Sequence, residues 1–170
     1  NLIPYKGHSE LLKAVAKIVP HFPDLCLLVV GQDHGIEKAL RTQAETLRVA
    51  TSIQWLGLRY DIPDLLAAAD IYVCASHEEG FSNSLLEAMA AGKAVIATKV
   101  GGNKEMLEEG ALGLLVEPRD IDGLVAGLKR LFTDSVLRER LGQIASARVA
   151  SSYGAAQMAE QYVALYRRGA

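Results

Sequence analysis

Two glutamates eight positions apart, Glu79 and Glu87, lie in the stretch SHEEGFSNSLLEAMAAGKAVIAT. Glu79 falls where a strand is expected to stop, and Glu87 falls inside the amphipathic run that follows. Carboxylates accept hydrogen bonds from hydroxyl groups, so Glu79 suits the hydroxyls of a sugar and Glu87 suits a vicinal diol such as a ribose. Two solvated glutamates at a helix end would show the same spacing, and the pair alone does not separate these interpretations.

The turn between the two glutamates contains groups that can bind a negatively charged ligand. Ser82 or Asn83 is the expected N-cap of the helix. The amides from Gly80 to Ser84 are expected to point out of the helix start, where the helix dipole favours negative charge. Gly80 has no side chain, so a ligand can approach the backbone closely.

The composition excludes several classes of protein. The chain has 170 residues, half of them apolar, and its 18 basic and 20 acidic residues give a net charge of −2. This length fits one globular domain, and a nucleic-acid-binding surface would normally show as a basic excess. No apolar run reaches the ~18 residues of a membrane span, and the N-terminus has no signal-sequence pattern. We expect a cytoplasmic protein without a nucleic-acid partner.

Cys26 and Cys74 both lie inside apolar runs, so we expect two buried, reduced thiols. Neither a Cys-x-x-Cys motif nor a cluster of Cys and His accompanies them. The sequence therefore predicts no disulfide and no metal site of that kind.

Short apolar segments alternate with amphipathic segments along the chain. The first apolar segment, DLCLLVVG, has the continuous character of a strand buried on both faces of a parallel sheet. Strands are expected at residues 24–31, 52–57, 70–76, 94–98 and 112–118, with helices between them and three helices at the C-terminal end. This alternation predicts an α/β fold with a doubly wound parallel sheet. Ligands of such sheets bind at the carboxyl ends of the strands, which is where Glu79 falls.

The stretch EEGFSNSLLEAMAAGKAVIAT resembles the E-x7-E signature of retaining nucleotide-sugar glycosyltransferases of the GT-B fold, the group 1 glycosyltransferase family. Other segments are similar to further parts of the family: PYKGHSELLKA to its lysine-glycine loop and first helix, LLVVGQDHG to its central strand and glycine loop, IQWLG to the strand before the base pocket, and GLLVEPRD to the segment after the signature. The similarity covers nearly all of the chain. It implies a Rossmann-like domain, one half of a GT-B fold.

The resemblance also implies a domain assignment. Residues 1–170 match the C-terminal domain, which binds the nucleotide-sugar donor. The sequence opens on a loop that leads into a helix, so we expect that the first strand and an N-terminal acceptor-binding domain belong to a longer protein. The 170-residue chain alone is expected to be inactive as a transferase.

The resemblance assigns roles to individual residues. Lys6 matches the lysine that contacts the donor diphosphate, and Glu79 matches the glutamate that holds hydroxyls of the transferred sugar; these two are the expected catalytic residues. Glu87 matches the glutamate that binds the nucleotide ribose. The residues expected to line the sugar and the phosphates are Gly80, Phe81, Ser82, Asn83 and Ser84.

Two further positions bear on the donor. Leu58, Arg59 and Tyr60 fall where relatives bind the nucleobase, although an exposed turn would have the same composition. Many relatives carry an arginine as a second diphosphate contact where this sequence has Asn1. Diphosphate binding therefore relies more on Lys6, or a cation comes from elsewhere.

The expected partners follow from these roles. The donor is a nucleotide-diphosphate sugar, carrying UDP or GDP, that serves as substrate, and no cofactor is expected. Lys6 together with a helix N-terminus can replace a metal ion at the leaving diphosphate, so the mechanism is expected to be metal-independent. The basic tip formed by Tyr166, Arg167 and Arg168 is either a peripheral membrane contact of the full-length protein or a solvated chain end.

Two alternatives to a glycosyltransferase of polysaccharide or glycolipid synthesis stay open. A GT-B-fold sugar-nucleotide epimerase has a similar nucleotide domain, and a non-catalytic nucleotide-binding module would need the same loops. The run EGF-x4-LEAMA favours the transferase.

Overall fold

The computed structural model describes residues 1–168, except for the side chains of residues 155, 156, 158, 160, 161, 165 and 168. Helices and strands alternate in the expected order. The strands are β1 (Leu27–Val30), β2 (Ile53–Gly57), β3 (Ile71–Cys74), β4 (Ala94–Thr98) and β5 (Leu114–Val116). The helices are η1 (Pro4–Lys6), α1 (His8–Ile18), α2 (Glu37–Thr46), η2 (Ala50–Ser52), α3 (Ile62–Ala68), α4 (Asn83–Ala90), α5 (Asn103–Met106), η3 (Glu108–Gly110), α6 (Ile121–Thr133), α7 (Ser135–Ser152) and α8 (Ala155–Arg168).

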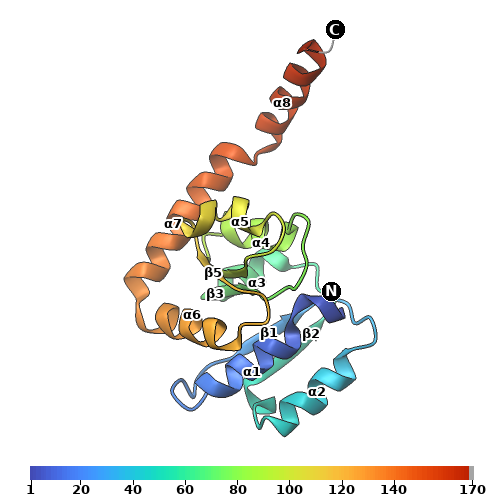
Figure 1. Cartoon of the computed structure of the whole chain (residues 1–170), viewed down its shortest axis with the longest axis vertical. Coiled ribbons are helices and arrows are strands. Elements are labelled where there is room, and N and C mark those ends of the chain that lie inside the picture. Colours follow the sequence, from blue (N-terminus) through green and yellow to red (C-terminus); the bar gives the residue numbers. More distant parts are fainter. Residues whose placement is uncertain (169–170) are drawn as a thin grey trace.

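Every strand pairing in the described part of the chain is parallel, which confirms the predicted α/β class. The hydrogen bonds define two sheets, β1-β2 and β3-β4-β5, rather than one continuous sheet. The N-terminal segment links the carboxyl ends of the two sheets (Figure 1). Leu2 forms a parallel bridge with Asp33 after β1, and the His77 amide after β3 donates to the Tyr5 carbonyl at 2.6 Å.

Both faces of β4 are buried, as expected of a doubly wound sheet. Alternate residues of a strand point to opposite faces, and Ile96 packs in one apolar cluster with α1 and α6 while Val95 packs in a second cluster with α4. Both side chains are fully buried. The sheet and its helices therefore hold the carboxyl ends of β3 and β4 in fixed positions.

Two helices in the C-terminal part begin at aspartate caps. The Asp120 carboxylate accepts a hydrogen bond from the Gly123 amide at the start of α6, and the Asp134 carboxylate accepts one from the Leu137 amide at the start of α7. Such caps satisfy amides that have no partner within the helix. Helix α8 continues from α7 and extends away from the sheets (Figure 1).

The expectation of two buried thiols is wrong for one of them. Cys74 is buried at the end of β3, whereas Cys26 is exposed. The reason is that β1 begins at Leu27 rather than at the expected residue 24, so Cys26 belongs to the preceding loop and not to the buried strand.

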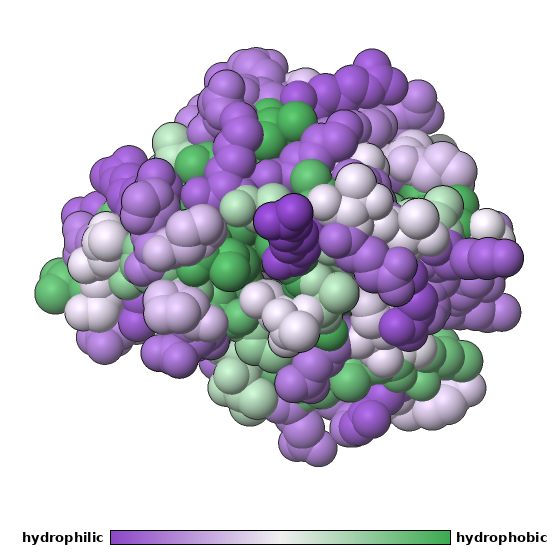
Figure 2. Space-filling view, turned by 90° about the horizontal axis from the view of Figure 1, so that it is seen from below, coloured by the Kyte–Doolittle hydropathy of each residue, from purple (hydrophilic) through white to green (hydrophobic). Residues whose placement is uncertain are grey.

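The surface matches the mixed composition. On the face shown in Figure 2, hydrophilic residues are interspersed with small groups of apolar residues. None of the helices within residues 1–168 has the length and apolar character needed to cross a bilayer. Tyr166 and Arg167 of the basic tip lie on α8 and are exposed, and the side chain of Arg168 lies outside the described residues.

Candidate functional site

The structure brings Lys6 and Glu79 together at the carboxyl end of β3. The Lys6 ammonium lies 2.5 Å from Glu79 Oε1, and the two side chains are 26% and 8% exposed. The turn at Gly7 makes this approach possible. Gly7 has a φ of +68°, and a Cβ there would collide with the Ala75 carbonyl. A side chain at this position would therefore push η1 and Lys6 away from β3.

The Glu79 carboxylate is held through one of its two oxygens. Oε1 accepts a hydrogen bond from the Ser76 hydroxyl at 2.7 Å in addition to the contact with Lys6, and the Cys74 thiol lies 3.8 Å away. Oε2 has no hydrogen-bond partner among the described residues, and solvent reaches it. Glu79 therefore presents one unoccupied acceptor oxygen.

The loop after β4 supports the loop that carries Glu79. The Gly102 amide donates to the Gly80 carbonyl at 2.8 Å. Gly101 has a φ of +46°, and a Cβ there would collide with the Glu79 carbonyl. The Thr98 hydroxyl donates to the Ser76 carbonyl at 2.6 Å. Gly101 and Gly102 are thus close backbone contacts of the Glu79 loop.

The start of α4 leaves its amides available. Ser82 occupies the N-cap position, as predicted, but its side chain makes no capping hydrogen bond. Among the described residues, the amides of residues 80–84 have no hydrogen-bond acceptor. Phe81 is 51% exposed and its ring lies 6.0 Å from that of Tyr153. The helix start can therefore receive an anion through unpaired N–H groups.

The other residues predicted on α4 are exposed. The Ser84 hydroxyl accepts a hydrogen bond from the Tyr72 hydroxyl at 2.8 Å, and burial raises the pKa of Tyr72. Asn83 and Glu87 are exposed. Within residues 1–168, no hydrogen bond or ion pair joins the Glu87 carboxylate to Lys6 or Glu79.

The loop after β2 exposes two apolar side chains. Leu58 is 54% exposed and Tyr60 is 88% exposed. The Arg59 guanidinium forms two hydrogen bonds to Asp61, one of 2.7 Å from Nε, and this pairing lowers the pKa of the Asp61 carboxyl. The Arg59 guanidinium is therefore paired with Asp61. The exposed Tyr60 ring is the side chain of this loop that could stack on a nucleobase.

The Asp33 carboxylate accepts hydrogen bonds from amides of the turn that leads into α2, including the first amide of the helix. Its Oδ1 accepts hydrogen bonds from the amides of Gly35, Ile36 and Glu37 at 2.9, 2.9 and 3.0 Å. These bonds, the one from Glu37 most strongly, lower the pKa of the Asp33 carboxyl.

His77 follows Ser76 in the loop after β3, but its side chain contacts α1 rather than Glu79. Its Nε2 lies 3.2 Å from the Glu10 carboxylate on α1, and this buried nitrogen makes no hydrogen bond among the described residues. His77 thus faces α1, and the sequence gives no signal for this long-range contact.

The sequence contains an Asp-x-Asp motif, which the expectation of a metal-independent site did not take into account. Asp120 and Asp122 are separated by one residue, an arrangement that can hold a divalent cation. Asp120 caps α6, and Asp122 pairs with Lys17 at 2.6 Å. Both carboxylates therefore have structural partners, and they lie outside the loop that carries Glu79. No group of three metal-ligating side chains is found in the described part of the chain.

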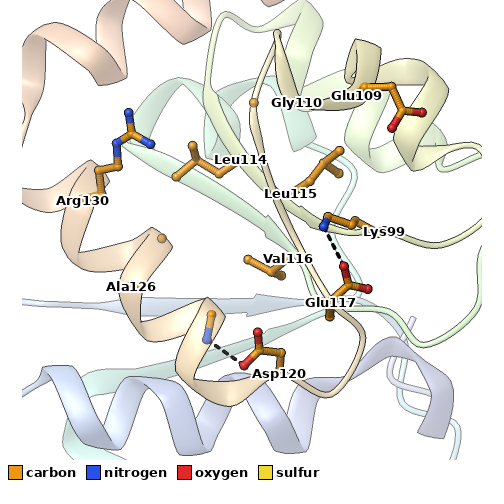
Figure 3. Close-up of a pocket in the computed structure, with 13 residues that line it drawn as sticks. Lys99, Glu109, Gly110, Leu114, Leu115, Val116, Glu117, Asp120, Ala126 and Arg130 are labelled. Atoms are coloured by element: carbon orange, nitrogen blue, oxygen red, sulfur yellow. Dashed lines mark hydrogen bonds and ion pairs between the residues drawn. The ribbon is translucent and has the colours of Figure 1, made fainter.

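A separate groove of about 480 Å³ lies between β5 and α6. Lys99 and Glu117 pair at 2.6 Å on its rim, and Arg130 lies on its α6 side (Figure 3). None of the residues that line it is Lys6, Glu79 or Glu87, so this groove is distinct from the predicted site.

Comparisons with known proteins agree on one family. A family model described as "Glycosyl transferases group 1" matches residues 1–148. The chain is similar to a phosphatidyl-myo-inositol mannosyltransferase of Mycolicibacterium smegmatis, with 41% identity over 86% of this chain and 38% of the relative. It is also similar to an N-acetyl-alpha-D-glucosaminyl L-malate synthase of Bacillus anthracis, with 31% identity over 98% of this chain and 43% of the relative. The chain thus spans about two fifths of the length of these curated relatives.

Solved structures share the fold. HepE of Anabaena, crystallised in complex with UDP, has a TM-score of 0.91 and 28% identity over 99% of this chain and 47% of that chain. The C-terminal domain of a group 1 glycosyl transferase, LpcC of Francisella tularensis, has a TM-score of 0.82 and 33% identity over 91% of this chain and 83% of that chain.

Proposed function

Because the chain belongs to the group 1 glycosyltransferase family, we propose that residues 1–170 form the donor-binding domain of a retaining GT-B glycosyltransferase. The acceptor-binding domain lies N-terminal to it in the full-length protein. The observation that carries this proposal is the meeting of Lys6 and Glu79 beside the unpaired amides at the start of α4.

The geometry supports a model in which different groups of the site bind different parts of the donor. When the glycosidic bond to a nucleoside diphosphate breaks, negative charge develops on the β-phosphate. Lys6 and the amides at the start of α4 are oriented before the reaction to stabilise that charge. The free oxygen of Glu79 accepts a hydrogen bond from a hydroxyl of the transferred sugar, and Glu87 accepts hydrogen bonds from the ribose.

The nucleotide and the product class are proposed from relatives. HepE has been crystallised with UDP and with UDP-glucose, so UDP is the first candidate nucleotide, followed by GDP. One relative is named for transfer to a phosphatidyl-inositol, and a structural neighbour, WaaG, is described as involved in lipopolysaccharide biosynthesis. We therefore propose a product among glycolipids or polysaccharides, and peripheral membrane contact of the full-length protein.

A thermal-shift screen of the 170-residue chain against UDP, GDP, ADP and their common hexose conjugates tests the proposal. A ligand that binds only the folded state stabilises it by ~2.7 kcal/mol at a hundredfold excess over its dissociation constant. We expect one base to be favoured and no sugar transfer by the chain alone. Absence of stabilisation by every nucleotide would contradict donor binding, and a robust transferase rate would contradict the domain assignment.

A further inference from the structure

We propose that Ser76 is a positioning residue: its hydroxyl anchors Glu79 Oε1, so that Oε2 is turned to the donor sugar, and Thr98 and Asn103 hold Ser76 in place. This inference rests on the proposed function and adds three residues to it. None of these three residues is predicted from the sequence as part of the site.

The two oxygens of Glu79 have different surroundings. Oε1 receives the Ser76 hydroxyl at 2.7 Å and the Lys6 ammonium at 2.5 Å, and within residues 1–168 Oε2 receives no donor. Two donors on one oxygen fix the rotation of the carboxylate, and Oε2 is then left to accept a hydroxyl. A bound diphosphate also attracts Lys6, so Ser76 is the anchor that stays in place when the donor binds.

Ser76 is itself fixed by a buried chain of hydrogen bonds. The Thr98 hydroxyl donates to the Ser76 carbonyl at 2.6 Å, and the Asn103 amide nitrogen donates to the Thr98 carbonyl at 3.1 Å. The three residues are 1%, 1% and 0% exposed. The donor groups of this chain are paired, whereas the buried Asn103 Oδ1 has no partner among the described residues. The paired Ser76, Thr98 and Asn103 donors restrict the movement of the loop that carries Glu79.

The Cys74 thiol fills the space between these groups. Its Sγ lies 3.6 Å from the Ser76 hydroxyl, 3.8 Å from Glu79 Oε1 and 3.8 Å from the Asn103 amide nitrogen. A thiol is a weak hydrogen-bonding group that packs as a small apolar side chain. Cys74 is therefore a weak additional donor to Glu79 Oε1, and Ser76 makes the shorter and stronger bond.

The anchor acts on the sugar end of the site. The phosphates are proposed to bind at the start of α4. Among the described residues, the network reaches that helix start through two long contacts of the Ser82 hydroxyl, at 4.0 Å from the Cys74 thiol and 3.4 Å from the Ser84 hydroxyl. Removal of the Ser76 hydroxyl should therefore reduce the affinity contributed by the sugar and spare the affinity for the bare nucleotide. A general loss of structure would reduce both.

Calorimetric titration of the full 170-residue chain separates these effects. The probes are two pairs, UDP with UDP-glucose and GDP with GDP-mannose, and the readout is the ratio of affinities within the pair that binds. We expect Ser76→Ala to lower this ratio about tenfold, the factor that corresponds to ~1.4 kcal/mol. Thr98→Val, which removes the next hydroxyl, should lower it less, and Ser76→Thr should keep it. Thr133→Val is the matched control, because its hydroxyl lies on the exposed end of α6.

Each outcome has a defined meaning. If the wild type gains affinity from the sugar and Ser76→Ala keeps the whole gain, the positioning role is wrong while the proposed function stands. Equal losses for nucleotide and sugar nucleotide also overturn it. A wild type that binds none of the four probes overturns the proposed function and this inference with it. If Ser76→Ala does not fold, a folded Thr98→Val with an unchanged ratio overturns the proposal, and a lowered ratio supports it.

Discussion

The Lys6 ammonium and Glu79 Oε1 lie 2.5 Å apart and join two loops that are 73 residues apart in the sequence. The contact places a cation and a carboxylate side by side next to the unpaired amides of α4. In the proposed function, Lys6 is thus held beside the diphosphate site before the donor binds, and Glu79 is held beside the site of the sugar.

Lys6→Ala should weaken binding of a nucleoside diphosphate and of the matching nucleotide sugar alike, because the diphosphate is common to both ligands. Loss of a hydrogen bond to a charged group suggests a cost of ~1.5–3 kcal/mol. Calorimetric titration measures both affinities. Lys13→Ala is the matched control, since Lys13 is exposed on α1. Full affinity of Lys6→Ala for both ligands would exclude Lys6 as a diphosphate ligand.

Two glycines of the site should respond differently to alanine. A Cβ on Gly80 meets no atom within 4 Å, whereas one on Gly101 collides with the Glu79 carbonyl at a backbone φ of +46°. We expect Gly80→Ala to keep the melting temperature and weaken ligand binding, because the new methyl group occupies the path to the backbone. Gly101→Ala should lower the stability by more than the ~1–3 kcal/mol of a strained backbone conformation, because the collision with the Glu79 carbonyl adds to that cost. Thermal denaturation that ranks the two variants in the opposite order would contradict this account.

Nucleotide affinity should be nearly unchanged by EDTA, because Lys6 and the helix start are proposed to replace a metal ion at the diphosphate. The measurement is the affinity of the 170-residue chain with and without the chelator, in buffers free of Mg²⁺ and Mn²⁺. A tenfold or greater loss on chelation would show that a set of metal ligands takes part in binding.

The cap of α2 should make a pH-dependent contribution to stability. The pKa of the Asp33 carboxyl is lowered in the folded state, so this residue stabilises the fold above the ordinary carboxyl pKa of about 4. The contribution is lost as the pH falls through the lowered value. Asp33→Asn keeps an oxygen that can cap the helix but does not titrate. Denaturation curves should therefore show a stability difference between wild type and variant that narrows from pH 7 to pH 3, and a constant difference would contradict the assignment.

The sequence predicts the parts of the site that depend on local pattern. The apolar segment 70–76 followed by Gly80 and the helix of Glu87 predicts a loop at the carboxyl end of a strand, and the structure confirms it. The supporting residues Ser76 and Thr98 are not predicted as such. A buried polar residue at a strand end has no signal that distinguishes it from a solvated one, because its partners lie on another strand.

Other differences have the same origin in contacts between distant segments. Cys26 was expected to be buried because it continues an apolar run, but hydrogen-bonded pairing begins at Leu27. The contact of His77 with Glu10 joins a loop to a helix 67 positions earlier in the sequence. Periodicity describes the neighbours of a residue along the chain, whereas these features depend on neighbours across the fold.

The central claim is that Glu79 binds the sugar and Glu87 binds the ribose. The most direct test is calorimetric titration of Glu79→Ala and Glu87→Ala with UDP and UDP-glucose. GDP and GDP-mannose replace this pair if the chain favours guanine. Glu87→Ala should weaken binding of nucleotide and nucleotide sugar alike, by ~1.5–3 kcal/mol. Glu79→Ala should leave the affinity for the bare nucleotide intact and remove only the gain that the sugar provides. Equal losses of bare-nucleotide affinity from the two substitutions would contradict this division of roles.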